Sequence, residues 1–510
     1  MAATEPYDYV VVGGGSAGNV VARRLVDAGA QVALVEAGGP PTDANIHDPG
    51  GWPELMQSAC DWAFFTEPQP AAGGRRIYWP RGRVLGGTSA LNGMAYIRGH
   101  RLDYDAWAHL GCEGWGWDDV LPMFKRSEDC DLGETETRGA GGPLRVTTRF
   151  EPHPFLAAFA DAAQAAGVPW NDDHNTGELD GVGFSQLTIR DGIRQTTEAA
   201  FLHRVLDATN LTVHANALAR RLVVSRGRCT GVEIASGSET RRLEGREVIL
   251  CGGTIGSAQL LLLSGIGPAA ELRPLGIEPV VDLRGVGKNL QDHLISPVTC
   301  TVRRPIPPRR PGLTQHHVHL FWRSRPGLVV PDTQPVCFHI PLYAQDWMEG
   351  PAEGEAFTVV GGLIRPASRG ELRLASADPA VPPLLDPRYL SAEIDLDALT
   401  RSVQLCREIV RSGALSDWTA DELYPGPEVR TFAELRDYVR RTVGSYHHQV
   451  GTCKMGRDAG SVVDPELRVN GVEGLRVADA SVMPLITTGN TYAPSIMIGE
   501  RAAELVLAAA

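Results

Sequence analysis

The sequence predicts a mixed α/β fold with more than one domain, on the basis of two observations. The length of 510 residues exceeds what a single hydrophobic core usually holds. At the N-terminus, two continuous apolar runs, 9–12 and 32–35, flank a glycine-rich turn and a helical segment. Such runs are typical of strands buried on both faces of a parallel sheet. We therefore expect a Rossmann-type unit joined to at least one further domain.

The glycines of this turn, Gly13, Gly15 and Gly18, have the G-x-G-x-x-G spacing of a dinucleotide site. The first permits the tight turn, the second lets a pyrophosphate approach the backbone, and the third lets the helix over 18–28 pack on the strand. Glu36 ends the second strand, where a carboxylate holds ribose hydroxyls and repels an extra 2′-phosphate, so FAD or NAD is favoured over NADP. An ordinary glycine-rich turn is the alternative. Three neighbours are expected to contact the same cofactor: Ser16, Ala17 and Ala37.

Composition excludes several classes of function. The formal net charge of −13 argues against binding to nucleic acid or to anionic membranes. The nine cysteines contain no C-x-x-C pair, which predicts reduced thiols in a cytoplasmic protein and no metal site. No apolar run approaches the length of about 20 residues that spans a bilayer. We expect a cytoplasmic protein without a membrane span.

A second glycine-rich stretch covers 81–99, where Gly86, Gly87 and Asn92 would expose backbone N–H groups and an amide. Such groups suit an anion or the edge of a flavin, and a glycine-rich surface loop is the alternative. The irregular segment 39–72 is too long for a simple connection, so we expect it to cover a ligand.

Residues 81–99, followed by the DYDAW run at 103–107, resemble the first signature of the glucose–methanol–choline oxidoreductases, and most closely their choline-dehydrogenase-like branch. The family's other motifs follow in its order over nearly the whole chain. They lie at 250–260, 264–268, 286–293, 448–456, 462–464 and 474–481. The resemblance implies an FAD-dependent alcohol oxidase or dehydrogenase, with oxygen or a quinone- or dye-like compound as electron acceptor.

The resemblance also implies the domain organisation. The FAD-binding domain is expected to be discontinuous, formed by 1–150, 190–295 and 440–510. The substrate domain, 151–189 and 296–439, is expected to be α+β, with an antiparallel sheet over the flavin. The family's cofactor-binding positions fall on Arg83, Gly86, Gly87, Ser89, Asn92, Gly93, Met94, Ala95, Ala219, Asp479, Ala480, Asn490 and Thr491. Some relatives bind FAD covalently through a histidine where this chain has Leu91, so we expect non-covalent FAD.

The chemistry of alcohol oxidation needs a hydride acceptor, which flavin N5 can supply, and a base for the hydroxyl proton. By register with the family's H-x-x-G-T-C motif, His448 is that base. The second active-site position falls on Asn490, which cannot take a proton but can orient the alcohol oxygen. As the only base, His448 is expected to give a rate that rises with pH through an ordinary histidine pKa of about 6.5.

Three other functions stay open: an FAD-containing lyase of the hydroxynitrile lyase type, which does no redox chemistry, an NAD-dependent dehydrogenase, and a non-catalytic flavin protein. The substrate is also open. A quaternary ammonium group needs an aromatic cage and a carboxylate, which the sequence alone does not assemble. The candidate pocket residues are His447, Trp347, Phe338, Phe357 and His339.

Overall fold

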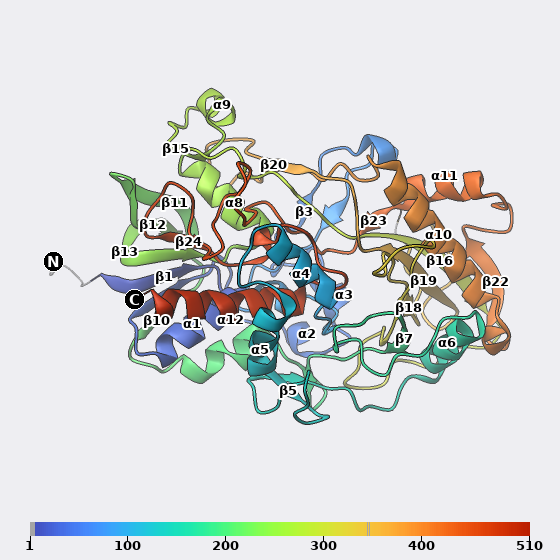
Figure 1. Cartoon of the computed structure of the whole chain (residues 1–510). Helices are drawn as coiled ribbons and strands as arrows, with labels where there is room; N and C mark the ends of the chain where they lie inside the picture. The colour runs from blue at the N-terminus through green and yellow to red at the C-terminus, as the bar shows by residue number, and fades with distance from the viewer. Residues whose placement is uncertain (1–5, 344, 346, 510) are drawn as a thin grey trace.

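The computed structural model describes residues 6–343, 345 and 347–509. Within these ranges the chain forms two seven-stranded sheets, which lie toward opposite ends of the molecule (Figure 1). One sheet is largely parallel and the other is antiparallel. The mixed α/β fold predicted from the sequence is confirmed.

The parallel sheet is built around β1 (Tyr7–Val12), whose last four residues are buried. It pairs in parallel with β2 (Val32–Val35) on one side and with the end of β13 (Glu239–Leu250) on the other. The first half of β13 continues into an antiparallel meander with β12 (Arg228–Ser236) and β11 (Leu218–Ser225). Two strands complete the sheet: β10 (Leu211–His214) beside β2, and β24 (Leu475–Val477) beside β13.

Helices cover both faces of this sheet, with α1 (Gly18–Asp27) and α12 (Tyr492–Ala508) on one face and α8 (Gly253–Leu263) on the other (Figure 1). α1 and α12 pack closely at Gly499, where a Cβ would lie 2.7 Å from the carbonyl oxygen of Ala17. The C-terminal segment of the chain therefore packs directly on the N-terminal one.

The fully buried carboxylate of Glu500 on α12 strengthens this contact. Arg24 of α1 donates two hydrogen bonds to it, at 2.9 and 2.7 Å. Arg126 and Ser127 of α5 (Trp117–Ser127) donate to it at 2.8 and 2.7 Å. Since a buried carboxylate is costly unless it is paired and hydrogen-bonded, this cluster fixes the relative positions of three helices.

The antiparallel sheet has β16 (Leu294–Val302) and β19 (Ala356–Leu363) at its centre. Helix α10 (Glu393–Val410) packs across both strands, and α6 (Pro154–Ala165) packs on the side of the sheet that ends at β7. The other strands are β22 (Thr419–Tyr424), β18 (Val336–Phe338), β17 (Val318–Phe321) and β7 (Gly181–Phe184), with β23 (Gly444–Ser445) beside β16.

The strands of each sheet come from segments that are far apart in the sequence, and two strands cross the limits predicted for the domains. The parallel sheet takes strands from 1–150, 190–295 and 440–510, and the antiparallel sheet mainly from the other two segments. However, β16 already begins at Leu294, and β23 lies within 440–510. Because Leu294 pairs with Ser445, the antiparallel sheet extends to the start of the loop that carries His448.

The remaining elements are short and lie mostly between the sheets or at their edges. The helices are α2 (Ala44–His47), α3 (Trp52–Leu55), α4 (Arg101–His109), α7 (Thr197–Ala200), α9 (Ala269–Leu272) and α11 (Phe432–Thr442), and the 3-10 helices include η2 (Gly87–Ala90) and η6 (Ala480–Val482). The strands are β3 (Phe64–Phe65), β4 (Tyr78–Trp79), β5 (Glu128–Cys130), β6 (Leu144–Val146), β8 (Ile189–Arg190), β9 (Ile193–Arg194), β14 (Ile266–Gly267), β15 (Val281–Asp282), β20 (Glu371–Arg373) and β21 (Leu384–Asp386).

All nine cysteines are free, and all but Cys60 are buried. Among the described helices, none combines the length and the hydropathy that crossing a bilayer requires. No cluster of three or more potential metal ligands occurs in the part of the chain that the structure describes.

Candidate active site

A cavity of about 570 Å³ lies between the two sheets and is lined by residues from both. Gly15, Glu36 and Ala219 line its end at the parallel sheet. His448 and Asn490 line the region near the antiparallel sheet. Residues that are more than 400 positions apart in the sequence therefore share one cavity.

The three glycines of the N-terminal turn have three different environments. Gly13 has φ +111°, and a Cβ there would lie 2.3 Å from the carbonyl oxygen of Cys251. A Cβ on Gly18 would lie 1.9 Å from the carbonyl oxygen of Gly13. A Cβ on Gly15 would meet no atom nearer than the Cα of Gly87, at 3.8 Å, and Gly15 lines the cavity. Only Gly15 leaves space for a ligand, which fits close approach of a pyrophosphate.

Glu36 holds its carboxylate at the cavity wall through the backbone. The N–H groups of Gly14 and Gly38 donate to it at 2.9 and 2.8 Å. Burial raises the pKa of Glu36 to about 7, against these hydrogen bonds, which lower it. Each carboxylate oxygen retains a further acceptor position, so the group fits the ribose hydroxyls of a dinucleotide.

The N-terminus of α8 forms a second polar part of the same end. Asp479 accepts hydrogen bonds from the N–H of Gly253 at 2.9 Å and from the hydroxyl of Ser257 at 2.6 Å. Its other oxygen accepts from the N–H of Ser481 at 2.8 Å. Asp479 thus ties α8 to the segment that follows β24, and both line the cavity.

The two predicted catalytic side chains are in contact. Nδ2 of Asn490 lies 3.1 Å from Nε2 of His448, and Nδ1 of His448 lies 3.0 Å from Nδ1 of His293. Gln334 donates from Nε2 to Oδ1 of Asn490 at 3.0 Å. These four side chains form one hydrogen-bonded chain along the wall.

This chain of hydrogen bonds assigns the protons. Because Oδ1 of Asn490 accepts from Gln334, its Nδ2 is the group that donates to His448. Nε2 of His448 then carries a lone pair, and Nδ1 carries the proton and donates to His293. Of the two ring nitrogens of His448, the one beside Asn490 is therefore the one able to take a proton.

His448 is held by its backbone as well as by its ring. Its N–H donates to Oδ1 of the buried Asp292 at 2.8 Å, and its ring stacks on Tyr446 with centroids 5.2 Å apart. Burial, together with the neighbouring His293 and His447, lowers the pKa of His448 well below its usual value. The imidazole is therefore neutral at physiological pH.

Most of the predicted cofactor residues line the cavity: Gly13, Gly15, Ser16, Ala17, Glu36, Ala37, Gly87, Asn92, Gly93, Met94, Ala95, Ala219, Asp479, Ala480, Asn490 and Thr491. Four do not: Gly18, Arg83, Gly86 and Ser89. The guanidinium of Arg83 lies over the ring of Trp62, 4.9 Å from its centroid. Ser89 donates to the carbonyl of Gly86 at 2.6 Å, so it shapes the loop rather than reaching the cavity.

Of the five predicted pocket residues, His447 and Phe338 line the cavity, and the other three predictions are corrected. Trp347 is 48% exposed and packs edge-on against Tyr424. Phe357 and His339 fail because side chains alternate along a strand. Val360 of β19 and Phe338 of β18 line the cavity. Phe357 lies three residues before Val360, and His339 directly follows Phe338, so both side chains point to the opposite face of the sheet.

Contacts on that opposite side account for both misplaced residues. The ring of Phe357 packs on Phe155 with centroids 4.7 Å apart, and that of His339 stacks on His153 at 4.6 Å. Both pairs belong to the packing between the sheet and the region around α6. Their aromatic or imidazole character therefore serves the core.

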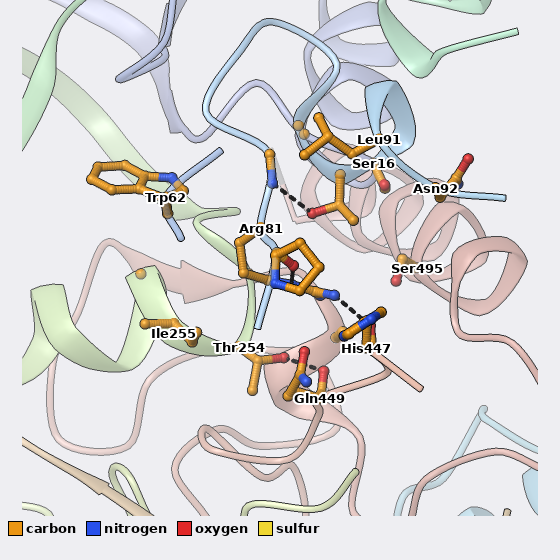
Figure 2. A pocket seen from close by; sticks show the side chains of 18 of the residues that line it. Ser16, Trp62, Arg81, Leu91, Asn92, Thr254, Ile255, His447, Gln449 and Ser495 are labelled. Carbon is orange, nitrogen blue, oxygen red and sulfur yellow. Dashed lines mark hydrogen bonds between the residues drawn. The ribbon is translucent and has the colours of Figure 1, made fainter. Parts of the chain in front are cut away.

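Sequence reasoning missed four residues of the site: Arg81, Asp292, His293 and Gln334. Figure 2 shows Arg81 pointing toward His447, whose carbonyl oxygen accepts a hydrogen bond from its Nη2. Asp292 and His293 lie in the 286–293 motif, which offered a signal, but their partners are about 155 positions away. Gln334 lies outside every motif, so no sequence pattern indicated its role.

A dinucleotide fold joined to a buried base at the other end of the same cavity defines a nucleotide-cofactor oxidoreductase. Two family models described as GMC oxidoreductase match residues 7–295 and 366–499. The chain therefore belongs to the GMC, or glucose–methanol–choline, oxidoreductases, as the resemblance predicted. Members of this family bind FAD, and this protein is an FAD-dependent alcohol oxidoreductase.

Named relatives agree with this assignment. Mitochondrial choline dehydrogenase of Homo sapiens is 41% identical, over 98% of this chain and 90% of the relative. Oxygen-dependent choline dehydrogenase of Brucella ovis is 39% identical, over 98% and 95%. The crystal structure of pyridoxine 4-oxidase from Mesorbium loti superposes with a TM-score of 0.94 and 35% identity, over 98% of each chain.

The different environments of Gly15 and Gly18 give the first testable prediction. Gly15→Val is expected to fold with a thermal midpoint close to that of the parent apoprotein but to purify with little flavin, because its side chain fills ligand space. Gly18→Val is expected to lower the midpoint or prevent folding, because the carbonyl of Gly13 cannot move away from a Cβ at 1.9 Å. Flavin absorbance per protein and the melting curve measure both effects. Full flavin content in Gly15→Val would overturn the assignment.

Proposed function

We propose that this protein oxidises a primary alcohol to an aldehyde, with His448 removing the hydroxyl proton while a hydride leaves the adjacent carbon for flavin N5. The contact between Asn490 and His448 carries this proposal. It combines a neutral imidazole, whose lone pair lines the chamber, with an amide donor beside it. Alcohol oxidation needs this pair of groups at one oxygen atom.

The proposed roles follow from the position of the two nitrogens. An alcohol oxygen that reaches Nε2 of His448 also comes within reach of Nδ2 of Asn490, since these atoms are 3.1 Å apart. The hydroxyl would then replace the direct hydrogen bond between the two side chains: it donates to Nε2 of His448 and accepts from Nδ2 of Asn490, which orients the carbon that loses the hydride. The O–H bond breaks as an N–H bond forms, and the C–H electron pair leaves as the C=O bond forms. His293 supports the tautomer by accepting from Nδ1–H.

The residues of the cavity fit FAD held without a covalent bond. FAD supplies the hydride acceptor when it is bound. Gly15 and Glu36 would hold its pyrophosphate and ribose, as their geometry described above supports. Leu91, which also lines the cavity, has no nucleophilic atom to form a link. Oxygen or a quinone- or dye-like compound would serve as the final acceptor.

The role of the base is tested by substitution. His448→Ala is expected to slow flavin reduction by an alcohol about 10²–10⁴-fold, which is the usual contribution of a positioned general base. Asn490→Ala is expected to slow it less, because the base remains. Flavin content should be unchanged in His448→Ala. Anaerobic stopped-flow absorbance measures the rates. Normal reduction in His448→Ala combined with an inactive His447→Ala would show that the base is misassigned.

The same experiment separates this function from a lyase. A redox enzyme loses its flavin absorbance when an alcohol is added without oxygen. If a panel of primary alcohols leaves the flavin oxidised while a cyanohydrin is cleaved, the lyase of the hydroxynitrile type replaces this proposal. Turnover with oxygen compared with turnover with an artificial dye identifies the acceptor.

The lowered pKa of His448 changes the expected pH dependence. A base whose pKa lies well below 6.5 is already deprotonated at pH 6.5, so the rate of flavin reduction should be constant above about that pH and fall only in more acidic solution. This differs from the sequence expectation of a limb centred near 6.5, which ignored burial. Anaerobic reduction rates across the pH range check it. A limb centred at pH 6.5 or above would contradict the structure-based expectation.

The absence of a nucleophile at Leu91 predicts complete release of the flavin. Denaturation with acid or heat is expected to leave all of it in the supernatant, and none with the precipitated protein. The absorbance of both fractions measures this. As a positive control for release, free FAD mixed with the apoprotein should behave identically. Yellow colour that persists in the washed pellet would reveal a covalent link.

A further inference from the structure

The part of the cavity around His448 and Asn490 forms what we call the substrate chamber. Its walls come from the antiparallel sheet and from the irregular segment near α3. The side chains that line it beyond the catalytic pair are Trp52, Met56, Ile295, His316, His319, Val336, Phe338, Leu342, Val360, Tyr446 and His447. These residues are apolar, aromatic or imidazole in character.

Four rings of this chamber form one contiguous surface. The ring of His316 lies 4.9 Å from that of Phe338 and 6.4 Å from that of His319, centroid to centroid. Trp52 packs at 6.4 Å from His316 and 6.3 Å from Phe338. Ring faces and edges at such spacings favour a flat apolar ligand, which can stack or meet them edge-on.

The chamber contains no carboxylate among the residues that the structure describes. The acidic side chains that line the whole cavity in the described ranges are Glu36 and Asp479. Both lie at the dinucleotide end, where backbone N–H groups and a hydroxyl hold them. Neither is placed to pair with a charge beside His448.

The charged group of the chamber is a cation. Arg81 lines the cavity and donates to the carbonyl of His447. Asp292 and Asp61 balance Arg81 electrostatically, but neither lines the cavity. The carboxylate of Asp292 already accepts hydrogen bonds from Tyr389, Ser445, Gln449 and the N–H of His448. Arg81 is therefore a charged side chain that a ligand could contact here, while the two carboxylates that balance it do not line the cavity.

The histidines add no negative charge and no pairing partner for a cation. Burial lowers the pKa of His316 to about 4 and of His447 to about 3, and it lowers that of His319 well below the usual value. They are neutral rings at physiological pH. A cationic ligand would lose its hydration here and gain only contacts with ring faces, without the countercharge that offsets the burial of a charge.

We propose that the substrate is an uncharged arylmethanol, whose ring packs on Trp52, His316 and Phe338 while its CH₂OH group reaches His448 and Asn490. This inference rests on the proposed function and adds the substrate class. It excludes a quaternary-ammonium alcohol as the preferred substrate. The choline dehydrogenases that this chain resembles are named for such an alcohol.

Three alcohols separate charge from shape. Choline and 3,3-dimethylbutan-1-ol have nearly the same size and differ by the positive charge, and benzyl alcohol adds the ring. With the holoenzyme under anaerobic conditions, the second-order rate constant of flavin reduction is expected to be at least about tenfold higher for 3,3-dimethylbutan-1-ol than for choline. Benzyl alcohol is expected to exceed both. Choline reacting faster than its carbon isostere, or the isostere reacting faster than benzyl alcohol, would overturn the proposal.

A wall substitution tests the missing carboxylate directly. Ile295 is partly buried on β16 and lines the chamber. Ile295→Glu is expected to shift the ratio of choline to isostere toward choline by about tenfold or more, while Ile295→Gln, of equal shape and no charge, leaves the ratio near that of the parent. The ratio compares two substrates on one protein, so a general loss of activity does not mask it. Equal ratios in the two variants would contradict the electrostatic argument.

A binding measurement distinguishes failure of this inference from failure of the proposed function. Benzamide and phenyltrimethylammonium share a ring, cannot be oxidised as alcohols, and differ in charge. Benzamide is expected to perturb the flavin absorption spectrum at concentrations about tenfold below those that phenyltrimethylammonium needs. If no alcohol reduces the flavin but this order holds, the proposed oxidation is wrong and the chamber's ligand class stands. The reverse order of the two ligands would refute the ligand class even if alcohols are oxidised.

Discussion

One buried carboxylate, Asp292, determines how the catalytic loop meets the two sheets. It is 3% exposed and accepts hydrogen bonds from the backbone N–H of His448, from the hydroxyls of Ser445 and Tyr389, and from the amide of Gln449. Burial raises its pKa, and these partners lower it. An unpartnered carboxylate in this position would be costly, so the loop that contains the base has little freedom to adopt another arrangement. The position of the base therefore depends on a residue that does not line the cavity.

The same burial that fixes the site also sets its chemistry. His448 is neutral because burial disfavours the imidazolium, and this leaves an acceptor lone pair on Nε2, but a low pKa also makes it a weak base. Hydride loss compensates for this weakness. As the C–H electron pair departs, the hydroxyl becomes the O–H of a protonated carbonyl, which is far more acidic than an alcohol. A weak base is then sufficient if the proton moves together with the hydride or after it, and Asn490 needs only to keep the oxygen in place.

The sequence could predict what depends on neighbouring residues. The spacing of Gly13, Gly15 and Gly18 predicts a tight turn from neighbouring residues alone, and the structure has a turn there between β1 and α1. The two parallel strands were also predicted from their apolar runs, while the assignment of His448 as the base came from the family motif and stays a prediction. Side chains whose role depends on distant partners were not predicted: Gln334 meets Asn490 across 156 positions, and no local pattern indicates it. The wrong predictions for Phe357 and His339 have a different reason. Alternate side chains of a strand point to opposite faces, so a prediction that is wrong by one residue places the side chain on the opposite face.

The position of Asn490 relative to the dinucleotide turn follows from the packing of two helices. Asn490 lies two residues before the start of α12, and the turn that contains Gly15 ends where α1 begins. Because Gly499 lets α12 pack on the start of α1, and the Glu500 cluster locks that contact, the two helices act as one rigid body. Asn490, the group proposed to orient the alcohol oxygen, and the turn that fits a pyrophosphate are therefore fixed to each other from opposite ends of the chain. Catalysis by hydride transfer needs such a fixed distance, since small displacements of the reacting atoms cost much of the rate.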